Sequence, residues 1–270
     1  MIRVGLTLPS FNGDPDVGLR VAVAAERAGI DGVFAYDHLF RIAPNGARRP
    51  ALECFSLMTA VAVATRRITI GSLVARASLR APKLLAQSFA TLQSAAGRSI
   101  IAGIGAGDHE SRVENESFGI GFGTLAGRIA QLDAAVHECV GLGLDVWVGG
   151  THPTVRSVAA TSNAAAWNRW GGAAAVFARE ATEVRATSSS PIATTWGGLV
   201  VLSGSDAHAR NKADVLKAPN IAMVGAPNTV AALLRPYVTA GASWLVLAPV
   251  DASDVSNVEL IAEVRELLIA

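Results

Sequence analysis

The sequence has few cysteines and few lysines. Its 270 residues include two cysteines, Cys54 and Cys139, which are too few for a disulfide-stabilised scaffold or a zinc site. We therefore expect a reducing compartment, the cytoplasm. The formal net charge is only +1, and lysine occurs only at positions 83, 212 and 217. This composition gives no electrostatic reason to expect binding to nucleic acid or to a membrane surface.

Long apolar runs are also missing. No stretch of about 18 apolar residues is free of Gly, Arg or Asp, so we expect no transmembrane helix, even though the mean hydropathy is +0.37. The first residues, MIRVGLTLPSF, form a strand-like run without the apolar core of a signal peptide. Hydrophobic residues make up 51% of the chain and charged residues 17%, which is enough for a large buried core.

Short apolar runs alternate with longer amphipathic segments along the chain. The runs predict strands, because they are brief, continuous and bounded by turn residues. They cover 4–8, 32–36, 68–74, 99–104, 145–148, 164–168, 192–202 (interrupted by Gly197 and Gly198) and 244–247. The amphipathic segments predict helices over 17–28, 52–65, 82–96, 125–140, 155–161, 173–185, 206–217, 228–240 and 255–269. A long loop is expected between Gly105 and Thr124.

Local residues support several of these boundaries. Gly29 and Gly97 follow helices in the position of a left-handed terminating residue. Pro82 stands where a first-turn proline belongs, and Asn228 is a candidate cap for the helix that it begins.

Continuous apolar strands that alternate with helices indicate a parallel sheet buried on both faces. Eight such units in this length favour a single-domain α/β protein over residues 1–270, a closed (β/α)8 TIM barrel. A doubly wound sheet is the rival fold. It usually has fewer strands, and the first strand–helix turn of this chain lacks a G-x-G-x-x-G motif.

In a barrel, the carboxyl ends of the strands carry the active site. His38 is the first candidate, since it follows a strand and an acidic residue and would act as a general acid or base tuned by Asp37. The alternative is a capping Asp37 beside a surface histidine. No H-x-E, H-x-x-x-H or C-x-x-C spacing is present, so we expect no metal site.

Two glycine-rich turns follow other strands. Gly103, Gly105 and Gly107 would let a flat ligand approach the backbone, or would serve packing alone. Gly149 and Gly150 precede Thr151 and a helix, as in a phosphate cradle or an ordinary tight turn. Several tryptophans in the second half would line a pocket or fill the barrel, and these are Trp147, Trp167, Trp170 and Trp196.

The chain resembles the bacterial luciferase-like superfamily, and within it the branch that uses the deazaflavin coenzyme F420. The resemblance rests on VGLTLPSF, AERAGIDGVFAYDHL, ITIGSLVARASLRAPKLLAQSFATLQSAAGRSIIAGIGAGDHESRVENESFGIGF, VWVGG, WNRWG, TWGGLVVLSG and VGAPNTVAALLRPYVTAGASWLVLAP, in that order. The superfamily fold is a (β/α)8 barrel. The resemblance implies hydride transfer to or from a flavin-type ring lying across the barrel mouth.

The resemblance also implies roles for individual residues. Asp37 and His38 are similar to the acid/base pair at the ring edge. Leu73-Val74 matches the turn where relatives carry a non-prolyl cis peptide bond that bulges against the ring. The remaining cofactor contacts would be Arg76, Gly105, Ala106, Gly107 and Asp108 near the ring and tail, and Gly149, Gly150 and Thr151 at the ribityl-phosphate end. The substrate side would be bordered by Ser10, Phe11 and Trp167.

The chain departs from its relatives at a few positions. Relatives often carry an aromatic residue in place of Asp108 and a small residue in place of Arg76. Only residues 141–144 separate the fourth long helix from the next strand, which implies a shortened insertion over the active site. Because lysines are scarce, arginine would have to hold a phosphate or polyglutamate tail.

The leading hypothesis is an F420-dependent oxidoreductase that acts on a small organic substrate and forms a homodimer. An FMN-dependent luciferase-like monooxygenase is the alternative enzyme, since one fold serves both chemistries. A non-catalytic barrel with a degenerate cofactor site is the alternative outside the enzyme class. The substrate and the direction of hydride transfer do not follow from the sequence.

Overall fold

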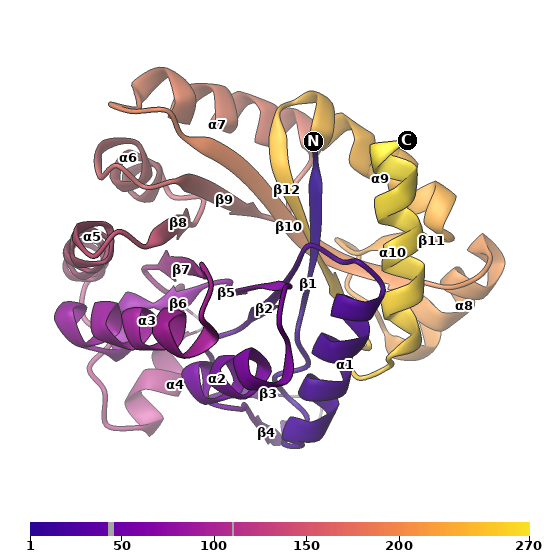
Figure 1. The fold of residues 1–270 in the computed structure, drawn as a ribbon, viewed down its shortest axis with the longest axis horizontal. Helices are drawn as coiled ribbons and strands as arrows, with labels where there is room; N and C mark the ends of the chain where they lie inside the picture. Colours follow the sequence, from indigo (N-terminus) through magenta and orange to yellow (C-terminus); the bar gives the residue numbers. More distant parts are fainter. Residues whose placement is uncertain (43–45, 110) are drawn as a thin grey trace.

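A computed structural model describes residues 1–42, 46–109 and 111–270, and it shows a closed parallel β-barrel (Figure 1). The strands of the ring pair in the order β10-β12-β1-β2-β5-β7-β8-β9, and β9 pairs with β10 to close it. Their bounds are β1 Arg3–Thr7, β2 Gly32–Ala35, β5 Thr69–Ser72, β7 Ile101–Gly105, β8 Asp145–Gly149, β9 Ala166–Trp170, β10 Ala193–Leu202 and β12 Ala242–Pro249. The predicted (β/α)8 barrel is confirmed, and the first strand lies next to the last.

Helices surround the barrel on its outer face (Figure 1). They are α1 Pro15–Arg27, α2 Cys54–Ala64, α3 Pro82–Ala96, α5 Leu125–Gly141, α6 Pro153–Thr161, α7 Ala174–Thr187, α8 Asp206–Leu216, α9 Pro227–Thr239 and α10 Ser256–Ile269. None of the helices in the described part of the chain has the length and apolarity needed to cross a membrane. Residues 142–144 alone join α5 to β8.

Helix ends follow the local chemistry of the sequence. Gly29 and Gly97 adopt φ values of 76° and 63° after α1 and α3, as predicted. Asn228 is not the cap of α9. The cap position is Ala226, because Pro227 starts the helix one residue earlier and needs no N–H partner there.

Side chains fill both faces of the barrel wall. Inside the barrel, aromatic rings from three different strands meet: Phe34 lies 5.5 Å from Trp147 and 5.8 Å from Trp244 between ring centroids. The predicted interruption of β10 at Gly197 and Gly198 is wrong, because the strand is continuous there. A Cβ at Gly198 would lie 2.3 Å from the Trp196 ring, so glycine makes room for tryptophan within a continuous strand.

Several short elements were not predicted, because they are too short to show a period. The expected loop from 105 to 124 contains α4 Ser111–Ser117. A hairpin of β3 Phe40–Ile42 and β4 Arg48–Pro50 follows β2 as a separate sheet. β6 Ala75–Arg76, the 3-10 turn Ala77–Leu79 and β11 Met223–Gly225 complete the fold.

Candidate active site

The carboxyl ends of the barrel strands enclose a cavity of about 520 Å³. All ten residues predicted to bind the cofactor line it together with the predicted base. These are His38, Leu73, Val74, Arg76, Gly105, Ala106, Gly107, Asp108, Gly149, Gly150 and Thr151. The cavity is also lined by Trp170, for which the sequence allowed a pocket as one alternative. Other lining residues were not assigned to the site from the sequence, and these are Tyr36, Ser111, Leu125, Arg128, His152, Val155 and Asn168.

Leu73 and Val74, which follow β5, form a bulge that makes one wall of this cavity. The Leu73-Val74 peptide bond is cis, as the resemblance implies, and neither residue is a proline. The Val74 side chain lies against β7 and β8, and a Cβ at either Gly105 or Gly149 would come within 2.5 Å of its methyl groups. A Cβ at Gly103 would lie 2.0 Å from the Ser72 carbonyl oxygen. Packing of the bulge therefore explains these glycines without a ligand.

His38 pairs with a carboxylate that the sequence analysis missed. Its Nδ1 lies 2.7 Å from Oε1 of Glu114, which comes from α4. The predicted pairing with Asp37 is wrong. Asp37 is buried, and its Oδ2 accepts the Arg76 N–H at 2.9 Å and an Arg80 N–H at 2.7 Å. Neighbouring side chains in extended backbone point to opposite sides, so Asp37 and His38 face different surroundings.

The Glu114 carboxylate is held ionised. Burial by itself would raise its pKa, but hydrogen bonds from His38 and from the Leu39 N–H, together with the charge of Arg76, lower the pKa below its ordinary value of 4.5. Leu39 donates its N–H to Oε2 at 2.7 Å. An ionised acceptor places the proton of His38 on Nδ1 and leaves Nε2 free to exchange a proton with a bound molecule.

Arg76 holds this arrangement together from below the cavity. Its Nε donates to the Asp37 carbonyl oxygen at 2.8 Å, and its two terminal nitrogens donate to Asn115 Oδ1 at 3.2 Å and Glu114 Oε2 at 3.0 Å. The side chain is almost completely buried. Its guanidinium is therefore satisfied by polar partners, although the residue also lines the cavity.

Aromatic rings form the wall beside His38. Tyr36 lies 5.9 Å from Phe11 and 6.0 Å from Trp170 between ring centroids, and Phe11 lies 5.6 Å from His38. Burial raises the pKa of Tyr36 to about 12, although a hydrogen bond with Thr7 and the charge of Arg41 act in the opposite direction. Tyr36 is therefore a neutral hydroxyl near pH 7.

The other side of the cavity presents hydrogen-bond donors. Gly149 and Gly150 lead to Thr151 and α6, and a Cβ at Gly150 would lie 3.0 Å from Val155 Cγ1. Arg128 of α5 is 7% exposed and stacks on Phe122, with its Cζ 4.0 Å from the ring centroid. One terminal nitrogen donates to the Gly123 carbonyl oxygen at 3.3 Å, while Nε is buried without a partner.

No carboxylate of the residues described in the structure lies within 4.0 Å of the Arg128 guanidinium. A buried cation without a counter-ion is costly unless an anion joins it. The Arg128 guanidinium thus forms a site suited to an anion, whereas the nearby Gly150 N–H is already donated to the Asn168 carbonyl oxygen at 3.1 Å.

Comparison with known proteins agrees with this arrangement. The sequence profile of luciferase-like monooxygenases matches residues 2–142. The chain belongs to this family. Curated luciferase-like relatives include an F420-dependent glucose-6-phosphate dehydrogenase of Nakamurella multipartita, 32% identical over 149 residues. The match covers 55% of this chain, which spans only 41% of that relative's length. A protein of the same name from Tsukamurella paurometabola is 34% identical over 151 residues, 55% of this chain and 42% of the relative.

Solved luciferase-like structures share the whole fold. An F420-dependent secondary alcohol dehydrogenase, in complex with an F420-acetone adduct, superposes with a TM-score of 0.79 at 14% identity over 99% of both chains. The monooxygenase RslO1 from Streptomyces bottropensis gives a TM-score of 0.80 at 16% identity over 100% of both chains. At these identities the likeness establishes the fold alone.

Four predicted site residues of the luciferase-like chain do not line the cavity. Besides Asp37, these are Ser10, Phe11 and Trp167. Ser10 is buried and donates to the Leu8 carbonyl oxygen at 3.3 Å. Phe11 reaches the site through its ring contacts with Tyr36 and His38.

Trp167 is not on the substrate side. It is fully buried outside the barrel, stacks on Phe177 of α7 and donates its Nε1 hydrogen to the Gly150 carbonyl oxygen at 2.8 Å. Side chains alternate along β9, so Trp167 points toward the helices while the tryptophan three residues later, Trp170, lies at the cavity. Trp147 fills the barrel and Trp196 packs outside it on Tyr237.

Asp108 has a structural partner within the site. Its Oδ1 accepts hydrogen bonds from the Ser111 N–H at 3.0 Å and the Ser111 hydroxyl at 2.9 Å. The Asp108 carboxylate therefore fixes the start of α4. Because α4 carries Glu114, Asp108 supports the position of the histidine's partner.

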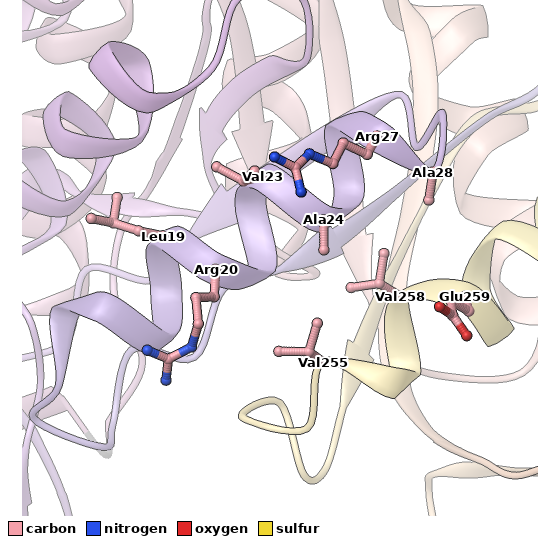
Figure 2. A pocket seen from close by; sticks show the side chains of 9 residues that line it. All are labelled: Leu19, Arg20, Val23, Ala24, Arg27, Ala28, Val255, Val258 and Glu259. Carbon is pink, nitrogen blue, oxygen red and sulfur yellow. The ribbon is translucent and has the colours of Figure 1, made fainter.

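A second hollow, of about 740 Å³, lies on the outer surface between α1 and the start of α10 (Figure 2). Its walls are largely apolar, with Leu19, Val23 and Val258 among them, and Arg20 and Arg27 extend along α1. No residue of a barrel strand lines it, so it is separate from the strand-end cavity. Among the residues that the structure describes, no group of three or more His, Cys, Asp or Glu side chains is arranged to hold a metal ion.

Proposed function

We propose that this protein is an F420-dependent oxidoreductase that transfers a hydride between the deazaflavin and a small organic substrate. The observation that carries the proposal is one cavity with the His38–Glu114 pair on one side and the uncompensated Arg128 guanidinium beside the Gly149-Gly150 turn on another. The strands β5 and β7 stand between these two sides in the barrel order, and the Val74 bulge projects between them.

The residues present fit such a cofactor. Arg128 has a buried Nε that no described group satisfies, and the turn at Gly150 admits no side chain without displacing Val155. The Arg128 guanidinium suits a phosphate group, whose oxygens would accept hydrogen bonds from it. Leu73, Val74 and Ala106 supply an apolar surface suited to a flat ring system.

In this proposal the bound cofactor supplies the hydride chemistry, and the protein supplies orientation and proton transfer. Nε2 of His38 exchanges a proton with a substrate oxygen as that oxygen changes between hydroxyl and carbonyl. Glu114 stabilises the imidazolium that forms and fixes the ring through Nδ1. Arg76 keeps Glu114 ionised, and the rings of Tyr36 and Trp170 exclude water from the substrate side.

The relatives support the choice of cofactor. The curated relatives named above are F420-dependent dehydrogenases, and a neighbour of the same fold holds an F420-acetone adduct. The fold is also found in a Baeyer–Villiger monooxygenase in complex with FMN, so fold alone does not select the cofactor.

Titration of the purified protein with F420 and, in parallel, with FMN tests the proposal by cofactor fluorescence. Micromolar binding of F420 with much weaker binding of FMN is the expected result. Tight binding of FMN would instead make the protein a flavin-dependent monooxygenase. Failure to bind either cofactor would leave a non-catalytic barrel and end the proposal.

We further propose that the chain acts as one domain, in the cytoplasm, as a homodimer. The pairing of β1 with β12 supports one domain, and the two buried free cysteines suit a reducing compartment.

The surface of a homodimer would be formed by exposed helix residues. Ala22 and Ala25 of α1 face the core and are not available to a partner. Val63 of α2 and Leu84 of α3 are exposed on neighbouring helices and favour association there. Light scattering coupled to size-exclusion chromatography measures the molar mass in solution and so tests whether the protein is a dimer.

A further inference from the structure

The hairpin of β3 and β4 carries three exposed arginines beside the candidate active site. Arg41 stands directly opposite Arg49 in the register of the two strands, and Arg48 stands opposite Ile42. Like charges that face each other across an antiparallel pair destabilise it. Repulsion therefore acts within a sheet of only two short strands, which has little other pairing to offset it.

Within the part of the chain that the structure describes, these charges have no counter-ion. No carboxylate oxygen of residues 1–42, 46–109 and 111–270 lies within 4.0 Å of the Arg41, Arg48 or Arg49 guanidinium groups. The start of α1 approaches Pro50 through Gly13, but the Asp14 carboxylate there already accepts the N–H of Asp16 at 3.0 Å.

Aromatic contacts nevertheless hold two of the arginines in place. The Arg41 Cζ lies 5.5 Å from the centroid of the Phe11 ring, and the Arg48 Cζ lies 4.5 Å from that of Phe40. An Arg48 nitrogen also donates to the Ser117 hydroxyl at 3.2 Å. The charges are thus positioned by contacts that leave most of their hydrogen-bond donors free.

The hairpin is fixed next to His38. The Phe11 ring that contacts Arg41 also lies 5.6 Å from the His38 ring between ring centroids. The hairpin begins at Leu39, whose N–H is bound by the same Glu114 carboxylate that holds His38. At the far end, Leu52 donates its N–H to the Ser10 carbonyl oxygen at 2.8 Å. Arg41 is therefore one ring away from the proposed proton donor.

The donor suited to a cofactor phosphate lies elsewhere, since Arg128 belongs to α5. Arg41 and Arg49 do not line the cavity themselves, but Arg41 contacts Phe11, which in turn contacts the cavity residue His38. A cofactor phosphate would need only Arg128. From this arrangement we infer that the substrate is a small organic anion, a carboxylate or a phosphate monoester, whose charged group is bound by Arg41 and Arg49. The inference rests on the proposed function for its statement that the anion is a substrate.

The test compares neutral and anionic molecules with the full-length protein. Binding of lactate is compared with that of 2-propanol, and binding of glucose 6-phosphate with that of glucose, by isothermal titration calorimetry in the presence and absence of F420. Each charge-assisted hydrogen bond that is lost weakens binding by about tenfold. At least one anion is expected to bind at least tenfold more tightly than its neutral counterpart, and which pair shows the gap identifies carboxylate or phosphate.

Variants then locate the effect. Arg41→Gln and Arg49→Gln are expected to remove the preference for the anion and to leave the dissociation constant of F420 unchanged. Arg66→Gln is the matched control, because Arg66 is exposed before β5, at the opposite end of the barrel. Arg49→Glu is expected to raise the melting temperature by removing the like-charge pair, while anion binding is lost.

Three results would overturn the inference. These are equal binding of the anionic and neutral molecules, an anion preference that persists in both glutamine variants, and weakened F420 binding in those variants with no change in anion binding. The last result would make the hairpin a site for the cofactor's own tail. If F420 does not bind at all but the arginine-dependent anion preference remains, the proposed function fails while the anion site stands.

Discussion

Nδ1 of His38 and Oε1 of Glu114 lie 2.7 Å apart although 76 residues separate them in the chain. The histidine follows β2, and the glutamate comes from α4 in the segment after β7. A second oxygen of the same carboxylate binds the Leu39 N–H and an Arg76 nitrogen. One carboxylate therefore fixes the histidine, the backbone beside it and the buried arginine.

Glu114→Gln is expected to lower turnover without unfolding the protein. An amide oxygen can still accept from His38, but it does not stabilise the imidazolium by charge. We expect kcat to fall by about 100-fold, within the range of general acid–base contributions, with little change in the Kd of F420. Steady-state kinetics and cofactor titration measure both quantities. Unchanged turnover would show that Glu114 has no part in proton transfer.

The same carboxylate makes stability depend on pH. The pKa of Glu114 is lower in the folded protein than its ordinary value of 4.5. The unfolded chain thus binds a proton first as pH falls, and the stabilisation by this group is full above that value and is lost as pH falls through the folded pKa. Chemical denaturation should show a stability gap between the natural protein and Glu114→Gln at pH 7 that narrows under acid. A constant gap would contradict the assignment.

Asp37→Asn tests a structural role for a residue that the sequence analysis placed in catalysis. Asp37 is buried and paired with Arg80 at 2.7 Å, so removal of its charge leaves Arg80 with the half-exposed Glu53 as its remaining carboxylate partner among the described residues. The expected loss of unfolding free energy is about 1.5–3 kcal/mol. Glu116→Gln is the control, because its pair with Arg112 is exposed and is worth at most about 1 kcal/mol. Equal losses in urea denaturation would contradict this role.

Gly105→Ala is expected to disturb the Val74 bulge. The added Cβ would meet a Val74 methyl at 2.5 Å, and overpacking of this kind costs about 1–3 kcal/mol. Gly121→Ala serves as the control, since a Cβ there meets nothing within 4 Å. Thermal unfolding of both variants, with F420 binding measured alongside, checks the prediction. A Gly105→Ala protein of natural stability would show that the bulge yields without cost.

Arg128→Met is expected to weaken binding of ligands that carry phosphate. Removal of a buried charge-assisted donor costs about 1.5–3 kcal/mol, or at least tenfold in Kd. The natural protein should bind FMN more tightly than riboflavin, and the variant should not distinguish them. Titration of both flavins keeps this test independent of turnover. A preference for FMN that survives the substitution would place the phosphate elsewhere.

The sequence by itself determined the barrel, because each strand of the ring and each long helix around it has a local pattern of apolar residues. Apolar runs, Pro82, Gly29 and Gly97 fix elements through backbone preferences that need no distant partner. The same logic assembled most of the cavity, since the carboxyl ends of parallel strands must meet at one edge of the sheet. The resemblance to a family located the Leu73-Val74 turn within it.

Only the tertiary structure decided which side chains work together. Asp37 and His38 are neighbours in the chain, yet one binds Arg80 and the other binds Glu114. Trp167 and Trp170 share a strand, yet one packs in the core and the other lines the cavity. Side-chain partners depend on where separate loops lie over the barrel. Those loop positions are fixed by contacts between residues far apart in the chain, and no local pattern in the sequence indicates which of these residues meet.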